Sequence, residues 1–510
     1  MSRPSNLEEV VDTLRNSKQQ GRACSLLIGA GVSLTAGIPT AAGFVDEIRQ
    51  RFPAKVKRAP EATTYPACMA RLHLGEVRDL ISGYVDKARI NWAHVCIALL
   101  MEHGYVDRVL TTNFDPLVAR ACALSGVFPA VYDFAASQLF KPANLPDRAV
   151  FHLHGQRTGF VLLNTEEEVT RLSEASAPVF QNAGQGRTWI VVGYSGDQDP
   201  VFKHLANVPG FDYGLYWITY KNNEPGQHVR EQLISDTKSA FYVTGFDADS
   251  FFVTLCQRLL IFPPGLVARP FTHLSKIIGM LSPYRMPGQS EEEDVTRLPR
   301  EWISSAVEQY ENPIEAATRH AHEGTVPHEK ELPDAVVAAA TELVMSGQYR
   351  EALAFAKIYE RLKTPQLGDM LAWAHTMLGN QLVERASRES DPEKAVELLF
   401  DSEAEYDSAL KIKPGMHEAL YNWGVVLSDQ AKTKTGEEAD KLYAQAYEKY
   451  EAVLKIKPEY DSALYNWGNA LSDQAKTKTG EEADKLNLLA KEKFEQAGVP
   501  LLSNPNKTEN

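Results

Sequence analysis

A fifteen-residue segment occurs twice in the second half of this 510-residue chain. The segment SDQAKTKTGEEADKL spans residues 428–442 and recurs without a change at residues 472–486. Two flanking segments recur at the same interval of 44 residues, KIKP at 411–414 and 455–458, and ALYNWG at 419–424 and 463–468. A fixed period of this length indicates supersecondary units that bury their apolar faces only by stacking on one another.

Each repeated unit contains two helical patterns. Their apolar faces carry Leu420, Trp423 and Leu427 in the first pattern and Ala446, Tyr450 and Leu454 in the second. Helix–turn–helix units with small and aromatic residues and a terminal proline resemble the tetratricopeptide repeat, which is about 34 residues long. The segment KTKTGEEADK supplies about ten further residues, which we expect to lengthen the helices or the turn between them. Since Trp423 and Trp467 occupy identical positions in the repeat, we expect them in the core and not in a ligand site.

Weaker copies of this pattern precede the two clear ones. The segment GQYREAL at 347–353 is typical of a turn between paired helices, and residues 395–410 supply another second helix. The sequence therefore predicts an all-α, tetratricopeptide-like solenoid over residues 333–498, followed by a flexible tail at 499–510.

The first half of the chain alternates short apolar runs with helical patterns. The runs span residues 25–31, 108–114, 149–155, 188–195, 214–220 and 239–245. They are apolar on both faces, which is typical of a parallel sheet covered by helices on both sides. We predict an α/β doubly wound, Rossmann-like domain over residues 6–284. The segment PGQSEEEDVTRLPR at 287–300 predicts a solvated linker over 285–332.

Charge and cysteine content exclude several classes of protein. The chain has 53 Lys and Arg against 67 Asp and Glu, a net charge of −14, so direct nucleic-acid binding is disfavoured. The polar start has no signal-peptide pattern and no run approaches the roughly 18 apolar residues of a membrane span, so we expect a cytoplasmic protein without membrane contact. The five cysteines form no C-x-x-C pair, which argues against disulfides and against a four-cysteine zinc site.

Polar and glycine clusters follow four of the predicted strands. They are Gly29-Ala30-Gly31 with Ser33, Thr111 to Asp115, His154-Gly155, and Gly193 to Asp197. The carboxyl ends of strands in a doubly wound sheet converge on one ligand crevice, so we expect these clusters to meet. A glycine turn before a helix also lets backbone N–H groups approach a diphosphate.

These clusters resemble the motifs of the sirtuin superfamily. The matching segments are GAGVSLTAGIP at 29–39, TTNFD at 111–115, HG at 154–155 and the turn at 193–195, and the resemblance covers residues 25–255. It implies that NAD is bound, with Asn113 and Asp115 beside the nicotinamide ribose and His154 as the catalytic base. The NAD-binding residues that it implies are Gly29, Ala30, Gly31, Ser33, Gly193, Tyr194, Ser195, Thr219 and Asn222. Among these, Ala30 and Ser33 would contact the phosphates, while Thr219 and Asn222 would lie on the adenine side.

Three neighbouring residues have a structural interpretation. We expect His152 to be structural, and Asp247 and Asp249 to cap a helix that begins near Ser250. Tyr194 either stacks near the ligand or packs in the core.

Two departures from the sirtuin pattern change the expected activity. The chain has no D-F-R after Pro39, and no cysteine lies in the 38 positions that separate Gly155 from Gly193, where protein-deacylating sirtuins carry a zinc module. Zinc-free domains of this kind, fused to repeats, resemble bacterial antiphage effectors that hydrolyse NAD. We therefore expect a latent NAD hydrolase without zinc, forming a homo-oligomer and triggered through its repeats by a protein partner. The alternatives are an NAD-dependent protein deacylase that the repeats recruit to substrates, and a non-catalytic NAD or ADP-ribose sensor.

Overall fold

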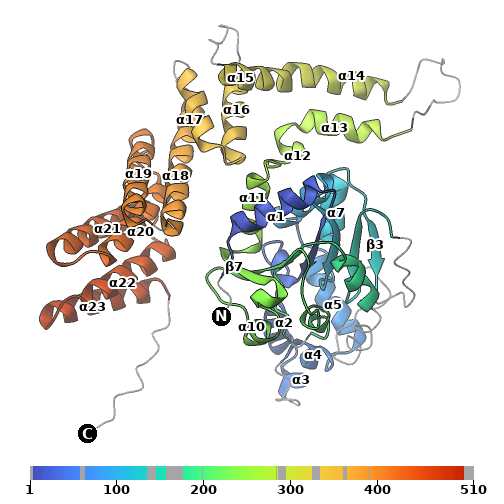
Figure 1. Ribbon diagram of the computed structural model, residues 1–510, viewed down its shortest axis with the longest axis horizontal. Coiled ribbons are helices and arrows are strands. Elements are labelled where there is room, and N and C mark those ends of the chain that lie inside the picture. Colours follow the sequence, from blue (N-terminus) through green and yellow to red (C-terminus); the bar gives the residue numbers. More distant parts are fainter. Residues whose placement is uncertain are drawn as a thin grey trace. The chain divides into compact units, whose positions relative to one another are not determined.

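The chain forms two compact units, residues 1–307 and 308–510, in a computed structural model (Figure 1). The structure describes residues 4–57, 64–134, 145–156, 176–197, 199–282, 284, 295–323, 333–359, 364–389 and 391–498. The predicted tail at 499–510 and the acidic run at 291–294 lie outside these residues.

A seven-stranded parallel sheet organises the first unit, in the order β3-β4-β2-β1-β5-β6-β7. The strands are β1 Cys24–Ile28, β2 Val106–Thr111, β3 Ala130–Asp133, β4 Ala149–His152, β5 Trp189–Val192, β6 Leu215–Tyr220 and β7 Ala240–Phe246. The predicted doubly wound sheet is confirmed, and six strands lie in the predicted apolar runs. The sequence analysis missed β3, because this four-residue edge strand leaves Val131 exposed and lacks a continuous apolar run.

Helices cover this sheet. The described helices of the first unit are α1 Leu7–Gln19, α2 Ala41–Arg51, α3 Pro53–Lys57, α4 Tyr65–Met69, α5 Leu74–Val85, α6 Trp92–Glu102, α7 Leu117–Leu124, α9 Phe202–Ala206, α10 Gln227–Gln232, α11 Ala248–Arg258, α12 Gly265–Ala268, α13 Pro270–Gly279 and α14 Arg297–Ala306. In α1, Leu7, Val10 and Leu14 repeat at helical spacing and are buried, while the side chain of Asn6 accepts the N–H of Glu9 at 3.0 Å. The apolar stripe of α1 packs against α11.

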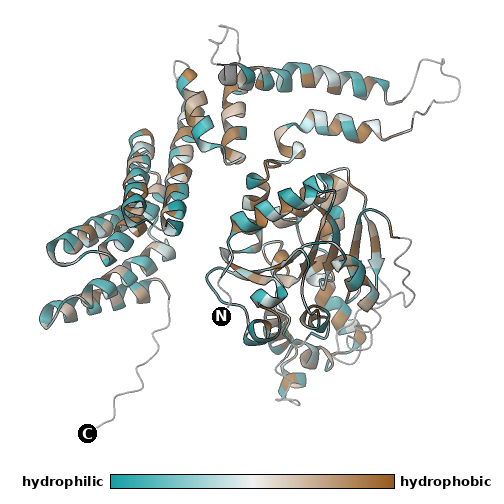
Figure 2. Cartoon of the chain, in the orientation of Figure 1, coloured by the Kyte–Doolittle hydropathy of each residue, from teal (hydrophilic) through white to brown (hydrophobic). Residues whose placement is uncertain are grey.

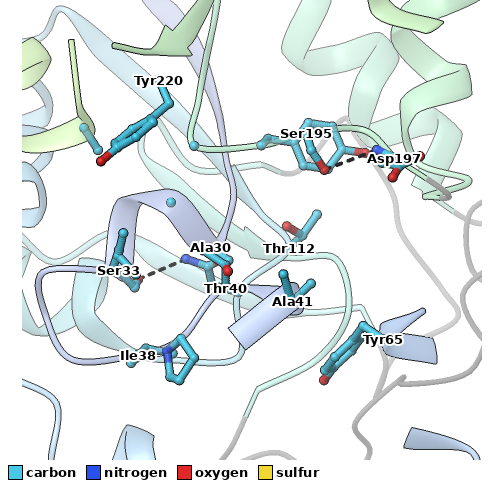
Figure 3. A pocket seen from close by; sticks show the side chains of 18 of the residues that line it. Ala30, Ser33, Ile38, Thr40, Ala41, Tyr65, Thr112, Ser195, Asp197 and Tyr220 are labelled. Carbon is cyan, nitrogen blue, oxygen red and sulfur yellow. Dashed lines mark hydrogen bonds between the residues drawn. The ribbon is translucent and has the colours of Figure 1, made fainter. Parts of the chain in front are cut away.

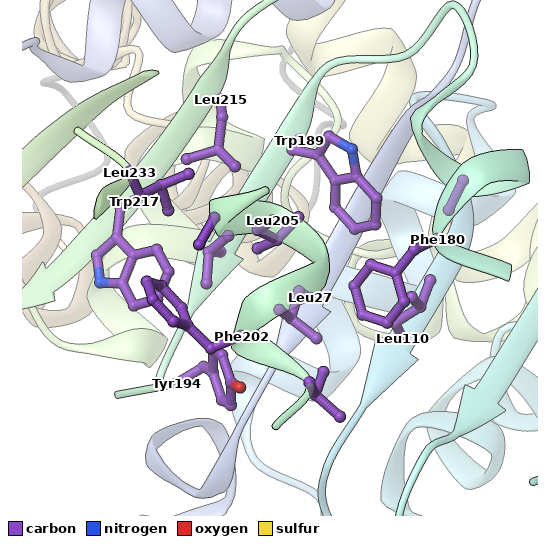
Figure 4. Packing of buried hydrophobic residues seen from close by; sticks show 14 of the residues in the cluster. Leu27, Leu110, Phe180, Trp189, Tyr194, Phe202, Leu205, Leu215, Trp217 and Leu233 are labelled. Carbon is purple, nitrogen blue, oxygen red and sulfur yellow. The ribbon is translucent and has the colours of Figure 1, made fainter. Parts of the chain in front are cut away.

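Both faces of the sheet are buried, as expected for parallel strands. On one face, Leu27, Leu110 and Trp217 belong to a hydrophobic cluster that also includes Phe202 and Leu205 of α9 (Figure 4). Residues one position along, such as Leu26 and Val109, are also fully buried on the other face. Figure 2 shows the contrast in patterning: the strands are largely hydrophobic, whereas the helices of the second unit alternate hydrophilic and hydrophobic stretches.

The second unit is helical. Its described helices are α15 Asn312–Glu323, α16 Pro333–Met345, α17 Tyr349–Ile358, α18 Pro365–Arg388, α19 Pro392–Ile412, α20 His417–Lys432, α21 Gly436–Ile456, α22 Asp461–Ala475 and α23 Glu481–Gln496. Consecutive helices pack in pairs, α18 with α19, α20 with α21 and α22 with α23. Only residues 433–435 separate α20 from α21, so most of the additional segment of the repeat lengthens the helices.

One contact recurs in each of these three pairs. A glycine of the first helix faces an aromatic ring of the second, as Gly379 with Tyr406, Gly424 with Tyr450 and Gly468 with Phe494. A Cβ atom at these glycines would lie 2.7–2.8 Å from the ring. The contact therefore adds α18–α19 as a third copy of the unit, which the sequence analysis had recognised only through its second helix.

Two expectations for this half of the chain need adjustment. Trp423 and Trp467 pack against the core cluster but are only partly buried, and the ammonium groups of Lys449 and Lys493 lie over their rings. Residues 297–323, expected as linker, form helix instead. The reason is that both helices bury apolar side chains beyond the acidic run: Ile303 of α14 is buried, and Ala317 of α15 belongs to a hydrophobic cluster with residues of α16 and α17.

Candidate functional site

A cavity of about 1240 Å³ lies at the carboxyl ends of the strands of the first unit. Residues that follow β1, β2, β4, β5, β6 and β7 line it, together with side chains of α2 and α4 (Figure 3). Strand β1 lies between β2 and β5, so the chain leaves it in one direction and later returns on the other side. Such a reversal opens the crevice in which doubly wound sheets bind ligands.

Three glycines bring the turns after β1 and β5 into backbone contact. The N–H of Gly31 donates to the carbonyl of Gly193 at 2.9 Å. A Cβ atom at Gly29 would lie 2.6 Å from that carbonyl oxygen, and one at Gly193 would lie 2.6 Å from the nitrogen of Val32. Gly193 also has a φ of 65°. Glycine is required here because no side chain fits between the two turns.

The hydroxyl of Ser33 is the centre of a buried hydrogen-bond network. It donates to Asp115 Oδ2 at 2.8 Å, accepts from Asn113 Nδ2 at 3.0 Å and lies 3.3 Å from His94 Nε2. Ser33 is 1% exposed. Its side chain therefore orients Asn113 and Asp115 and is already engaged, which differs from the expected contact with a phosphate.

Asn113 and Asp115 are fixed by further bonds. Asn113 Nδ2 also donates to the carbonyl of Gly29 at 3.2 Å, and Asp115 Oδ1 accepts the N–H of Leu117, the first residue of α7, at 3.1 Å. Burial raises the pKa of Asp115, although the bonds from Leu117 and Ser33 oppose this effect. Both side chains line the cavity in one preset arrangement.

His154 follows β4 and faces a carboxylate that the sequence analysis did not single out. Its Nε2 atom lies 3.5 Å from Asp199 Oδ1, and both residues line the cavity. His152 is buried, and its Nδ1 atom lies 3.1 Å from the carbonyl of Asn113. Burial lowers the pKa of His152 to about 4. The cavity thus receives His154, while His152 supports the backbone of Asn113, as the structural interpretation of this residue predicts.

Four of the residues expected to bind NAD lie at the cavity. Ala30, Gly31, Gly193 and Ser195 line the cavity, and the N–H of Asp197 donates to the hydroxyl of Ser195 at 3.3 Å (Figure 3).

Three other residues expected to bind NAD differ in their exposure to the cavity. Tyr194 lines the cavity, yet it is buried in the core with its ring 5.9 Å from that of Trp217. Thr219 also lines the cavity and donates its hydroxyl to the carbonyl of Val243. Asn222 is exposed outside the lining, and its neighbour Asn223 takes the place expected for it.

Further lining residues escaped the sequence analysis. Thr40 accepts the N–H of Gly43 and begins α2, which contributes Phe44 to the wall opposite the strands, and α4 contributes Tyr65. Asp247 caps α11 as expected, accepting the N–H of Ser250 at 2.8 Å.

The predicted capping role of Asp249 is wrong. Its carboxylate accepts the N–H of Ala93 at 2.7 Å and the hydroxyl of Thr35. It therefore ties the glycine turn to the start of α6.

In the described part of the chain, no group of three or more His, Cys, Asp or Glu side chains is arranged to hold a metal ion. Within the same residues, no helix combines the length and apolar composition that a bilayer crossing requires. All five cysteines are buried, and burial raises the pKa of Cys24 and Cys122 to about 12.

Comparison with known families agrees with this geometry. Residues 107–239 match the family described as SIR2-like domain. Residues 392–506 match the family described as plant-specific mitochondrial import receptor subunit TOM20.

Individual relatives are distant. An NAD-dependent protein deacylase of Pseudomonas putida is 29% identical over 163 residues, which are 30% of this chain and 56% of that protein. A crystal structure of a Sir2 homologue–NAD complex is 19% identical, with coverage of 51% and 96% and a TM-score of 0.33. A structure described under the structural basis for sirtuin substrate affinity is 19% identical, with coverage of 50% and 98% and a TM-score of 0.29.

Proposed function

We propose that the first unit hydrolyses NAD, releasing nicotinamide and ADP-ribose. The observation that carries the proposal is the meeting of Asn113, Asp115 and His154 at one cavity beside the glycine turn. At about 1240 Å³, the cavity exceeds the roughly 300–1,000 Å³ of typical small-molecule pockets, as an extended dinucleotide requires. The SIR2-like match and the NAD complex of a Sir2 homologue support NAD as the substrate.

The chemistry needs little beyond these side chains. When the bond between nicotinamide and ribose breaks, the ring nitrogen loses its positive charge, so the leaving group is neutral and needs no strong acid. Positive charge develops on the ribose, where the carboxylate of Asp115 offsets it and the amide of Asn113 orients the reacting groups. His154 accepts the proton of the attacking water as a general base.

The backbone contributes to binding as well. Ala30 is the first residue of a short 3₁₀ helix, Ala30–Ser33, at the glycine turn that lines the cavity. Backbone N–H groups in such a turn favour a diphosphate. This would explain how a chain with a net charge of −14 binds an anionic dinucleotide.

Protein deacylation is the second candidate, favoured by the Pseudomonas putida relative. The positions of the cysteines argue against it. All five are buried inside the first unit, and residues 156–192 between Gly155 and Gly193 contain none, so no cysteine is available for a zinc module in that interval. A silent NAD or ADP-ribose sensor is the third candidate, and the presence of both Asn113 and His154 argues against it.

We further propose that the activity is latent, because constant hydrolysis would drain the NAD of the cell. The repeats would receive a protein trigger during phage infection or hold a homo-oligomer, since repeat arrays offer extended binding surfaces. NAD depletion in the cytoplasm would then abort the infection.

One assay separates the three candidates. The full-length protein is incubated with NAD, with and without an acetylated peptide, and with lysate of phage-infected cells as the source of trigger. Nicotinamide and free ADP-ribose without peptide are the expected products. Product formed only with the peptide would establish the deacylase, and measurable NAD binding without turnover under every condition would establish the sensor.

A further inference from the structure

We propose that Asp199 is a positioning residue for His154: it holds the Nε2 side of the imidazole, so that Nδ1 accepts the proton during NAD cleavage. This inference rests on the proposed function and deepens it, because it specifies how the base is held. Neither the sequence motifs nor the comparisons with relatives single out Asp199.

His154 and Asp199 meet although they follow strands that are not neighbours in the sheet. His154 follows β4 and Asp199 follows β5, and β2 and β1 lie between these strands in the sheet. Three strand spacings separate the two strand ends, about 14 Å. The segment after β5 must therefore run back over the strand ends to bring Asp199 to His154, where Oδ1 and Nε2 are 3.5 Å apart.

Asp199 is held firmly where it meets the histidine. Its Oδ1 atom accepts the N–H of Val201 at 3.0 Å, and its carbonyl accepts the N–H of Phe202 at 3.1 Å. Val201 and Phe202 are buried in the core of the unit. The side chains of His154 and Asp199 are only 14% and 12% exposed. The carboxylate is thus part of the rigid frame, and the imidazole is the group that it orients.

The Nε2 atom of His154 has no other acceptor. It is buried and makes no hydrogen bond of normal length to the described residues, so the Asp199 carboxylate is the group placed to receive its proton. A distance of 3.5 Å is long for such a bond, but catalytic hydrogen bonds are often long without substrate and tighten when it binds. With Nε2 protonated toward Asp199, the remaining nitrogen, Nδ1, carries the lone pair.

The surrounding groups favour a charged Asp199. Burial alone would raise the pKa of Asp199, but His154, the N–H of Val201 and the hydroxyl of Tyr194 outweigh it and lower the pKa. His154 and Tyr194 are the titratable groups that act on this carboxylate among the described residues. Burial and Asp199 together raise the pKa of Tyr194, so this phenol stays protonated and does not compete as a base.

The pairing has a defined chemical consequence. Nδ1 takes one proton from water, the water oxygen bonds to the ribose carbon, and the electron pair of the broken bond leaves with nicotinamide. His154 is then an imidazolium whose Nε2 proton faces a carboxylate, which stabilises the charged form and makes the histidine a stronger base. A neutral amide at position 199 would keep the shape of the contact and remove this effect.

The test compares the full-length wild type with Asp199→Asn, Asp199→Glu and the control Asp212→Asn, an exposed aspartate before β6. The pKa of His154 is measured by NMR after histidine labelling, and its signal is assigned by its loss in His154→Gln. In Asp199→Asn we expect this pKa to fall by about one pH unit. The acid limb of the pH profile for nicotinamide release should move to lower pH by the same amount. The kcat should fall at least about tenfold, while KM stays within about twofold of the wild-type value. Asp199→Glu should restore part of the His154 pKa and part of kcat, and Asp212→Asn should match the wild type in both quantities.

The inference is overturned if folded Asp199→Asn leaves the pKa of His154 unchanged. It is also overturned if kcat falls in this variant without any shift of the pH profile, since a merely structural role would do the same. If the wild type does not cleave NAD even with lysate of phage-infected cells as the source of trigger, the proposed function fails, and the NMR titration alone still decides whether Asp199 sets the basicity of His154.

Discussion

The glycines of the cavity and those of the repeat helices meet opposite kinds of neighbour. Gly29, Gly31 and Gly193 lie against backbone atoms, so two turns approach each other and the space beside them stays open as the cavity. Gly424 and Gly468 lie against the rings of Tyr450 and Phe494, which fill the space that a side chain would occupy. The same residue type therefore opens a binding site in one unit and closes a core in the other.

The two units should therefore differ in the effects of substitutions at these glycines. A backbone neighbour moves only with its strand, whereas a ring can rotate or shift by a few tenths of an ångström. Changes at the cavity should therefore affect ligand binding and catalysis strongly, and equivalent changes in the repeats should affect only local stability. The four predictions below test this contrast.

The largest effect should come from the groups beside the reacting bond. Asn113→Ala or His154→Ala should lower nicotinamide release by about 10²–10⁴-fold, because each removes a preset group that acts in the transition state. Turnover of full-length protein with NAD and the same infected-cell lysate measures this, and Asn207→Ala, an exposed asparagine at the end of α9, is the control. Wild-type rates in either cavity variant would show that the residues line the cavity without acting there.

The backbone contact at Gly193 should give the next effect. Gly193→Ala places a methyl group 2.6 Å from the nitrogen of Val32, at a φ of 65°. We expect at least about 3 kcal/mol lost from the stability of the first unit, and weakened NAD binding, because strain and overpacking add. Gly75→Ala in α5 is the matched control, since nothing lies within 4 Å of its Cβ position. NAD affinity by calorimetry equal to that of the wild type would contradict the backbone-contact explanation.

The sequence predicted the parts of this site that depend on chain order. A strand followed by a glycine turn or a polar cluster is a local pattern, so the convergence of Asn113, His154 and Gly193 follows from the parallel sheet alone. The partners of these residues depend on where loops travel after leaving the sheet. Asp199 crosses the ends of two strands to reach His154, and Asp249 turns away from its own helix to Ala93 and Thr35. No local pattern encodes either path.

Acid should destabilise the first unit through its buried histidines. Burial lowers the pKa of His94 and His152 to about 4, against about 6.5 in an unfolded chain. The unfolded state binds more protons between these values, so stability is complete above about pH 6.5 and falls toward pH 4, by about 1.4 kcal/mol per histidine at pH 5.5. The raised pKa of Asp115 opposes this in part.

Hydrogen exchange can measure the acid destabilisation separately in each unit, because it reports local opening of the structure. Protection in β1, β2 and β4 should fall between pH 7.5 and 5.5 after correction for the intrinsic exchange rate. In His152→Asn this protection should depend less on pH, because one of the two buried histidines is absent. Protection that is independent of pH in both proteins would contradict the predicted linkage.

The smallest effect should come from placing a side chain at a glycine that contacts an aromatic ring in the repeats. In Gly424→Ala the new methyl group would lie 2.8 Å from the ring of Tyr450, which costs about 1–3 kcal/mol of overpacking. Alanine returns about 1 kcal/mol as a better helix former, so the net loss is at most about 2 kcal/mol. Gly415→Ala is the control because its Cβ position is open.

Thermal unfolding and exchange in α20 and α21 measure the loss, and Tyr450→Leu in the same chain should remove most of the clash. If nicotinamide release also fell in Gly424→Ala but not in Gly415→Ala, packing inside the repeats would affect the cavity, and the expectation that such a change affects only local stability would be wrong.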